Sequence, residues 1–380
     1  MPKRILFLNN TSDLYGASKV ALETVKVLKR NGYHVVFAIS DFGPICKALD
    51  ELSCPYEIIP LATIRRKYFS PKGVINRAVS FVKSWNAIKR ICKEHSIDTI
   101  YSNTTALVIG AFFSSRKKLN HIWHVHEISV GPKWLQRIYA KLLWRKTDLV
   151  IAVSEAVLNH WKKLEIRIPI KRIYNGFDFS HFTLEKSSLR SELGLSENDV
   201  IIGMLARVHF WKGQQYFLDI AKYLNTQGHQ VKFVMVGDAY PGYEYLYDEI
   251  KNKIEENGLS GLVCNLGFRS DIANILQGYD IFILPSILPD PLPTTVLEAM
   301  GAETAVVATA HGGASEMVVD QKTGLLIPWD DAKHAANLIS PLIEGKELRV
   351  RFGSEGRERV IKHFSLIEFE KNLIGAMKNV

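Results

Sequence analysis

The chain has 380 residues, of which 47% are apolar and 23% are charged. This composition is typical of a soluble globular protein and excludes a disordered chain. The chain is too long for a single hydrophobic core of ordinary size, so we expect two domains of about 150 to 200 residues each.

The net charge of +9 hides an asymmetry between the two halves of the chain. Residues 1–176 hold 29 Lys and Arg against 12 Asp and Glu, a balance of +17, whereas the rest holds 19 against 27, a balance of −8. We therefore expect the two halves to face different partners.

The N-terminus and the cysteines indicate a protein that stays in the cytoplasm. The apolar run Ile5–Leu8 is too short for a signal-peptide core, and no stretch approaches the roughly 20 apolar residues that cross a bilayer. Cys46, Cys54, Cys92 and Cys264 form no C-x-x-C pair and have no metal-ligand spacing. We expect reduced thiols, most of them buried.

Short β-branched or aromatic runs alternate with longer segments of helical period, which predicts parallel sheets joined by crossover helices. The strands expected in the first half are Arg4–Asn9, His34–Ile39, Tyr56–Ile59, Thr99–Ser102, His121–His126, Leu149–Val153 and Arg172–Tyr174. Those expected in the second half are Val200–Leu205, Lys232–Val236, Val263–Leu266, Ile281–Leu284, Ala305–Ala308 and Leu325–Ile327.

This alternation of strands and helices predicts an α/β protein with two Rossmann-like, doubly wound domains that face a central cleft. We place an N-terminal domain at residues 1–176 and a C-terminal domain at residues 177–362, joined by the polar stretch that begins "NGFDFSHF". Residues 363–380 contain a final helix that could pack on either domain, including back on the first. Ligands of such sheets bind beyond the carboxyl ends of the strands, so we expect the site residues in the loops that connect strands to helices.

In the first domain, Gly16 and Ala17 precede an expected helix and suit an anion or a closely packed sugar. The strand "HIWHVHE" places His124 and His126 on one face near its end. A histidine in a strand is often structural, and His126 is a candidate for the site. No G-x-G-x-x-G and no P-loop motif occurs, so dinucleotide-binding and P-loop functions lose their main support.

The segment from Ile58 to Cys92 contains eight basic residues and no acidic one. Apolar residues such as Phe81 and Trp85 interleave with them, a pattern typical of a helix lying on an anionic membrane surface. An ordinary amphipathic core helix with a solvated basic face is the alternative. A nucleic-acid partner ranks third, because no recognised nucleic-acid-binding module is present.

In the second domain, the strand "VIIGMLARV" leads into "HFWKG" and a helix. Arg207 and Lys212 thus flank a loop where free backbone N–H groups favour an anion, and Gly213 allows a close backbone approach. A diphosphate is the expected ligand, against the alternative of two solvated side chains.

The stretch "LPSILPDPLPTTVLEAMGAE" sets Asp290 and Glu298 eight positions apart. Prolines stiffen the loop around Asp290, which indicates a side chain held in place. Thr294 or Thr295 is expected to cap the next helix, and Thr295-x-x-Glu298 fits a capping box. Glu298 therefore has two compatible interpretations, a helix cap and a grip on paired ribose hydroxyls.

Three further glycines follow predicted strands. Gly237 in "VMVGDAY" indicates a tight strand exit or an ordinary turn. Gly312 and Gly313 in "ATAHGGASEMV" could let the backbone approach a ligand closely.

Together these loops resemble the retaining glycosyltransferases of family 4, which have the GT-B fold. "PDPLPTTVLEAMGAETAVVATAHGGASEMV" is similar to the E-x7-E region of that family, "ARVHFWKG" to its R-x4-K segment, and "VGDAYPG" to its glycine loop after a strand. "FRSDIANILQGYDIFILPS" resembles its lead-in strand. The first half resembles the family more loosely, through "HVHE", "IAVSEAV" and "YNGFD".

The resemblance implies a role for each candidate. Arg207 and Lys212 would neutralise the diphosphate of a nucleotide-sugar donor, and Glu298 would hold its ribose. Asp290 would touch the donor sugar and His126 would lie beside it, while Gly16 would let the first loop close over phosphate and acceptor. Transfer would proceed with retention, toward a glycan or lipid-linked acceptor in cell-surface polysaccharide synthesis at the inner face of the membrane.

Two residues depart from the family pattern. Asp290 is one methylene shorter than the usual Glu, and Tyr15 stands where many members have a second glycine. No D-x-D triplet occurs, so no metal and no other cofactor is expected. The alternatives are a nucleotide-sugar 2-epimerase of the same fold and a non-catalytic scaffold subunit of a glycosylation complex.

Overall fold

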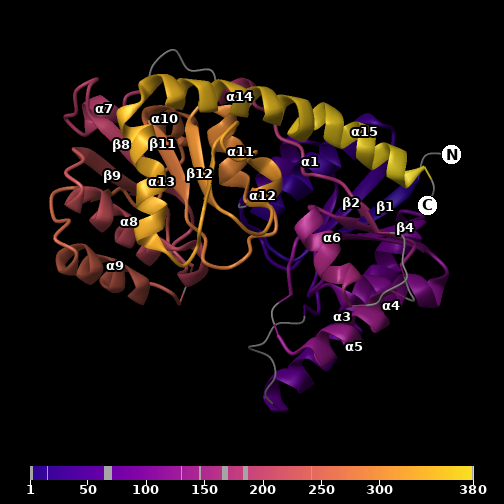
Figure 1. Ribbon diagram of the computed structural model, residues 1–380. Coiled ribbons are helices and arrows are strands. Elements are labelled where there is room, and N and C mark those ends of the chain that lie inside the picture. Colours follow the sequence, from indigo (N-terminus) through magenta and orange to yellow (C-terminus); the bar gives the residue numbers. More distant parts are fainter. Residues whose placement is uncertain are drawn as a thin grey trace. The chain divides into compact units, whose positions relative to one another are not determined.

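A computed structural model describes residues 3–14, 16–63, 71–129, 131–144, 147–164, 170–182, 187–240, 242–378 and 380 (Figure 1). The chain divides into two compact units. Unit 1 comprises Met1–Gly176 and Leu366–Val380, and unit 2 comprises Phe177–Ser365. No described helix combines the length and the hydrophobicity needed to cross a lipid bilayer.

The described residues of unit 1 form a parallel sheet of seven strands in the order β3-β2-β1-β4-β5-β6-β7. The strands are β1 (Arg4–Asn9), β2 (His34–Ile39), β3 (Tyr56–Ile58), β4 (Thr99–Ser102), β5 (Asn120–Val125), β6 (Leu149–Ala152) and β7 (Ile170–Arg172). The helices are α1 (Gly16–Arg30), α2 (Pro44–Glu51), α3 (Pro71–Glu94), α4 (Val108–Lys117), α5 (Lys133–Trp144), α6 (Glu155–Lys162) and α15 (Leu366–Met377). The strand order reverses between β1 and β4, as in Rossmann-like folds.

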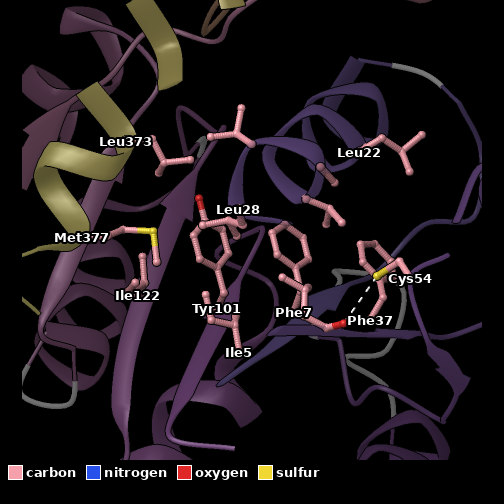
Figure 2. Packing of buried hydrophobic residues seen from close by; sticks show 14 of the residues in the cluster. Ile5, Phe7, Leu22, Leu28, Phe37, Cys54, Tyr101, Ile122, Leu373 and Met377 are labelled. Carbon is pink, nitrogen blue, oxygen red and sulfur yellow. Dashed lines mark hydrogen bonds between the residues drawn. The ribbon is translucent and has the colours of Figure 1, made fainter. Parts of the chain in front are cut away.

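Each face of this sheet has its own hydrophobic core, because alternate strand residues point to opposite faces. Ile5 and Phe7 of β1 belong to a core with α1 and α2, where Phe7 stacks on Tyr101 at a centroid distance of 4.6 Å (Figure 2). Leu6 and Leu8 belong to a second core with α3 and α4. Since both faces are covered, the central strands are buried at nearly every position.

Helix α15 completes the first of these cores from the far end of the chain. Phe369, Leu373 and Met377 are spaced by four residues, lie on one helical face and are at most 2% exposed. Figure 2 shows Leu373 and Met377 beside Ile122 of β5, in the same cluster as Phe7. The C-terminal helix therefore belongs to unit 1.

Unit 2 has a parallel sheet of six strands among its described residues, in the order β10-β9-β8-β11-β12-β13. The strands are β8 (Val200–Leu205), β9 (Val231–Val236), β10 (Val263–Asn265), β11 (Ile281–Leu284), β12 (Ala305–Thr309) and β13 (Leu325–Ile327). The helices are α7 (Leu189–Glu192), α8 (Gln214–Thr226), α9 (Tyr245–Glu256), α10 (Ile272–Gly278), α11 (Thr294–Gly301), α12 (Ala314–Met317), α13 (Ala332–Glu344) and α14 (Lys346–Phe364), with short 3-10 turns η2 (Ser180–Phe182) and η3 (Phe210–Lys212). Helix α8 packs against α9 and α13, whereas α11 packs against α10 and α14 (Figure 1).

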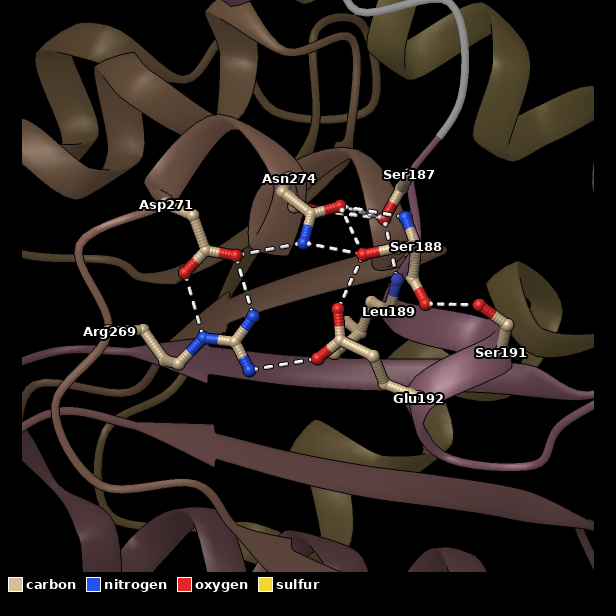
Figure 3. Close-up of polar contacts among 8 residues, drawn as sticks. All are labelled: Ser187, Ser188, Leu189, Ser191, Glu192, Arg269, Asp271 and Asn274. Atoms are coloured by element: carbon tan, nitrogen blue, oxygen red, sulfur yellow. Dashed lines mark hydrogen bonds and ion pairs between the residues drawn. The ribbon is translucent and has the colours of Figure 1, made fainter.

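Arg269, in the loop after β10, fastens helix α7 to the body of unit 2 (Figure 3). Its guanidinium donates to both carboxylate oxygens of Asp271, at 2.7 and 2.6 Å, and to Glu192 of α7 at 2.9 Å. Asn274 donates to Asp271 at 2.8 Å and accepts from the main-chain N–H of Ser188 at 2.8 Å. Arg269 holds the pKa of Asp271 well below its usual range. The contacts are partly exposed, so they orient α7 more than they stabilise it.

Every predicted strand is present, with bounds that differ by two residues at most. The largest shift is at β7, predicted at Arg172–Tyr174 and observed at Ile170–Arg172. This strand lies at the edge of its sheet and is largely exposed, so no alternation of apolar residues marks its ends. The thiols are free, and burial raises the pKa of Cys54 to about 11 and of Cys92 to about 12.

Candidate functional site

The site residues predicted in unit 2 follow four neighbouring strands, β9, β8, β11 and β12. In parallel sheets these strand ends form one edge, and ligands lie beyond it. The loops at this edge carry, in chain order, Arg207, Lys212, Gly237, Asp290, Gly312 and Gly313. The six residues therefore occupy the same edge of one sheet.

Lys212 and Asp290 form an ion pair between the loops after β8 and β11, in which the lysine Nζ donates to Oδ2 of the aspartate. The side chains are only 21% and 16% exposed, so the pair is less screened by water than a surface pair. The two residues lie 78 positions apart and meet because β8 and β11 pair in parallel. The sequence marked both residues but did not predict that they bond to each other.

Gly213 and Gly237 have positive φ angles, of 82° and 148°, in a region that other residues rarely adopt. A Cβ at Gly213 would overlap the carbonyl oxygen of Pro285, and one at Gly237 would overlap that of Ala206. Both glycines therefore let neighbouring loops of the protein meet. A contact of Gly237 with a ligand stays a prediction.

Gly312 and Gly313, after β12, pack against the loop that carries Asp290. The N–H of Gly313 donates to the main-chain carbonyl of Asp290 at 2.7 Å. A Cβ atom at Gly312 would overlap the backbone of Asp290, and one at Gly313 would overlap the backbone of Pro291. This contact, together with the surrounding prolines, holds the Asp290 backbone in place.

Arg207 lies with its guanidinium carbon 4.8 Å from the ring centre of Tyr240, at cation–π distance. Its main-chain carbonyl accepts a hydrogen bond from Gln214 at 2.9 Å. The pKa of the neighbouring His209 is lowered, first by burial and then by the positive charges of Arg207 and Lys212. The loop after β8 thus carries two positive side chains close to His209.

The capping box predicted at Glu298 is wrong. Helix α11 begins at Thr294 with Pro293 as its N-cap residue, and no side chain caps it. Glu298 consequently lies in the second helical turn, too far along for a capping box. Its side chain is nevertheless buried, at 8% exposure. The ribose-binding role stays a prediction, and the capping role is removed.

In unit 1, His126 lies directly after β5, next to the end of β4. Its Nε2 is 3.0 Å from Oδ1 of Asn103, and its ring centre is 4.3 Å from that of His124, the same-face neighbour that alternation predicted. Burial lowers the pKa of His126 to about 3. The imidazole is therefore neutral at physiological pH and cannot act as a cationic acid.

The carboxylate of Glu127 accepts hydrogen bonds from Thr104 and from the N–H groups of Thr105 and His126, the last two at 3.3 and 3.2 Å. Burial raises its pKa, and these hydrogen bonds oppose the rise. Neither Glu127 nor Asn103 was among the predicted site residues. A polar residue directly after a predicted strand is the signal that could have drawn attention to both.

Helix α1 begins at Gly16 itself, whereas Gly16 and Ala17 were both predicted to precede the helix. No described heavy atom lies within 4 Å of a Cβ built there, so packing within unit 1 does not require glycine. Its predicted role at a ligand stays a prediction. Tyr15 lies outside the described residues.

Among the described residues, one group of possible metal ligands gathers Glu57, Glu94 and His95. Both carboxylates form ion pairs with Arg90. Both carboxylate charges are thus compensated by one guanidinium.

Two family models match the chain and together span most of it. The model described as "Glycosyltransferase Family 4" matches residues 15–181, and the one described as "Glycosyl transferases group 1" matches residues 185–359. The chain belongs to glycosyltransferase family 4. This result confirms the resemblance found in the E-x7-E and R-x4-K regions.

Individual relatives of this family 4 protein differ in how much of the chain they cover. A galactosyltransferase of Escherichia coli, named as UDP-Gal:alpha-D-GlcNAc-diphosphoundecaprenol alpha-1,3-galactosyltransferase, is 23% identical across 93% of this chain and 91% of its own. The capsular polysaccharide biosynthesis glycosyltransferase CapM of Staphylococcus aureus is 27% identical across 57% of each chain. The crystal structure of Anabaena HepE with UDP and glucose has a TM-score of 0.85 and 26% identity over the whole of both chains.

The family 4 protein is a glycosyltransferase of bacterial polysaccharide or glycan biosynthesis, with two Rossmann-like units of the GT-B fold. These relatives give no support to the alternative of a nucleotide-sugar 2-epimerase.

Proposed function

We propose that this glycosyltransferase moves a hexose from a UDP-linked donor to a hydroxyl group of a glycan or lipid-linked acceptor, with retention at the anomeric carbon. The observation that carries this proposal is the Lys212–Asp290 pair, beside Arg207 at the strand-end edge of unit 2. The UDP-linked donor is suggested by HepE, whose crystal structures contain UDP or UDP-glucose, and by the name of the E. coli relative.

The proposed roles follow from charge and position. Arg207 and Lys212 neutralise the diphosphate of the donor, so no divalent cation is required. Glu298 accepts hydrogen bonds from the ribose hydroxyls, and Asp290 accepts one from the hexose. When the Lys212 ammonium binds the diphosphate instead of Asp290, the Asp290 carboxylate becomes available to the sugar. Preorganised positive groups of this kind stabilise the charge that grows on a leaving phosphate.

In the proposed reaction, the bond between the anomeric carbon and the diphosphate oxygen breaks while a bond to the acceptor oxygen forms on the same face. The acceptor hydroxyl proton passes to the leaving diphosphate oxygen. No side chain supplies a nucleophile or a base. His126 of unit 1 is proposed to lie beside the hexose, where its neutral ring offers a hydrogen bond without a charge.

A ligand that binds only the folded protein raises its melting temperature, so a thermal-shift comparison of UDP, GDP and ADP tests the donor. We expect the largest shift with UDP, and UDP-hexose hydrolysis that is lost in Lys212→Ala and Glu298→Gln. Lys222→Ala is the matched control, because Lys222 is an exposed lysine of α8 in the same unit. If folded wild-type protein neither binds nor hydrolyses any nucleotide sugar, the non-catalytic scaffold replaces this proposal.

We further propose that unit 1 rests on the inner face of the cell membrane through helix α3. Ile75, Val79 and Val82 form one stripe along α3 and are 67%, 50% and 60% exposed. Lys89 and Lys93 continue the same stripe and are exposed. An apolar stripe followed by basic residues is typical of helices on anionic membranes. Arg65, Arg66 and Lys67 of the predicted basic segment lie outside the described residues.

Cosedimentation with phosphatidylglycerol vesicles and with phosphatidylcholine vesicles tests this contact. We expect binding to the anionic vesicles at low salt, and its loss in Val79→Glu and Val82→Glu. Ile367→Glu is the matched control, since Ile367 is a 78% exposed apolar residue of α15 in the same unit. Equal sedimentation of wild-type and α3 variants would remove the membrane contact from the proposal.

A further inference from the structure

A chain of side-chain hydrogen bonds joins the loop after β1 to His126. Asn9, the last residue of β1, donates from Nδ2 to the carbonyl oxygen of Thr11 at 2.7 Å. Asn103 donates from Nδ2 to Oδ1 of Asn9 at 2.9 Å and to the carbonyl of Ala17, at the start of α1, at 3.3 Å. Oδ1 of Asn103 then lies 3.0 Å from Nε2 of His126.

The direction of every bond in this chain follows from its anchor. A carbonyl oxygen only accepts, so the Asn9 group that faces Thr11 must be the amide nitrogen. Oδ1 of Asn9 is then the acceptor that faces Asn103, and the Asn103 nitrogen is fixed by Asn9 and by the carbonyl of Ala17. The atom of Asn103 that faces His126 is therefore Oδ1, which can only accept a hydrogen bond. Nε2 of His126 must therefore carry a hydrogen.

We propose that Asn103 is a positioning residue that holds His126 as the tautomer with its hydrogen on Nε2, so that Nδ1 presents a lone pair to a hydroxyl group of the bound sugar. Among the residues that the structure describes, no hydrogen bond reaches Nδ1 of His126. The sugar as the ligand of Nδ1 rests on the proposed function. The tautomer itself rests only on the hydrogen-bond chain.

The surroundings of His126 keep its ring neutral. The titratable groups next to it are His124, whose ring centre is 4.3 Å away, and Glu127, whose carboxylate accepts from the main-chain N–H of His126. Tyr101 lies beyond them, with its hydroxyl 2.9 Å from Nδ1 of His124. The hydrogen bond that Oδ1 of Asn103 accepts thus selects Nε2 as the nitrogen that carries the hydrogen in the neutral ring.

The tautomer is measured by long-range ¹H–¹⁵N correlation spectra of protein labelled with ¹⁵N-histidine, with the His126 signals assigned by His126→Gln. In the wild type we expect a pyrrole-type shift for Nε2 and a pyridine-type shift for Nδ1. In Asn103→Leu we expect the two shifts to move toward each other as the tautomers mix. Ser102→Ala is the control, because the Ser102 hydroxyl bonds a different histidine, His121, at 2.9 Å.

Asn103→Asp keeps an oxygen that can accept from Nε2 of His126 but removes the amide that donates to Asn9 and Ala17. The carboxylate still accepts from Nε2, so the tautomer should persist, but its charge should raise the pKa of His126. Activity of this variant should then fall as the pH decreases, since a protonated Nδ1 cannot accept from a hydroxyl. Asn103→Leu should lower kcat by about tenfold, the effect of one lost hydrogen bond, with a small change in the donor KM.

A hydrogen on Nδ1 in the wild type, or unchanged His126 shifts in Asn103→Leu, would overturn the inference. The spectra are recorded without donor, so they do not depend on the proposed function. A protein with the expected tautomer that binds no nucleotide would contradict the proposed function and leave the role of Asn103 intact.

Discussion

At the residue scale, the site of unit 2 is organised by one ion pair. Lys212 and Asp290 are both mostly buried, and each satisfies the charge of the other. Removing one member of such a pair leaves an uncompensated charge, which costs more than the pair itself contributes. Asp290 therefore stabilises the free protein and, under the proposed function, would compete with the diphosphate for Lys212.

We expect Asp290→Asn to destabilise unit 2 by about 1–3 kcal/mol, because Lys212 loses its charged partner. UDP should stabilise this variant more than the wild type, since its diphosphate then meets no competing carboxylate. Urea unfolding with and without UDP measures both effects. Asp219→Asn is the control, because it removes another ion pair of the unit, Asp219–Lys253 at 2.8 Å. An equal response to UDP in both variants would contradict the competition.

At the element scale, helix α15 shows how a distant segment completes a core. Its residues come after all of unit 2, yet Phe369, Leu373 and Met377 pack with the strands of unit 1. The helical period of residues 366–378 predicted a helix that could pack on either domain. It could not predict the sheet that the helix covers, because the apolar face of a helix fits either of two similar cores.

We expect Leu373→Ala to destabilise unit 1 by about 2–5 kcal/mol, the usual cost of a cavity left by a fully buried leucine. Ile367→Ala should cost less than about 0.5 kcal/mol, because Ile367 is 78% exposed on the same helix. Urea unfolding followed by fluorescence compares the variants. Similar losses for both would mean that α15 does not pack into the core as described.

At the scale of the whole molecule, two units carry opposite charge, and the first six strands of unit 1 are ordered like the six strands of unit 2. The positive half holds His124 in β5 and His126 directly after this strand, both as neutral rings. The pKa of each is lowered, in both cases mainly by burial. Burying histidines neutral makes stability depend on pH.

An unfolded chain protonates each of these histidines near pH 6.5. The folded unit does not protonate His126 until about pH 3. The stability that the neutral ring contributes is therefore complete above pH 6.5 and is lost as the pH falls, by about 1.4 kcal/mol per pH unit for one histidine. Urea unfolding of wild type and His126→Gln between about pH 6 and pH 5 should show a slope that is smaller in the variant by this amount. Equal slopes would show that His126 does not titrate differently in the two states.

Local pattern was sufficient for the strands and for the family, because both depend on residues close together in the sequence. Central strands covered on both faces are mostly apolar, and such runs are visible in the sequence. The exposed edge strand β7 has no such constraint, and its bounds were shifted. The pattern Thr295-x-x-Glu298 was misread because a capping box depends on where the helix begins. Pro293 places that start earlier than the pattern assumed.

The sequence by itself determined two α/β domains, their strands, the family, and which loops carry the charged candidates. Only the tertiary structure decided that Lys212 bonds Asp290, that Asn9 and Asn103 direct the hydrogen of His126, and that α15 belongs to unit 1. The reason is physical: strand order sets which loops are neighbours, and no local pattern of residues encodes that order. Hydrogen bonds between loops exist only once parallel strands have brought their ends together.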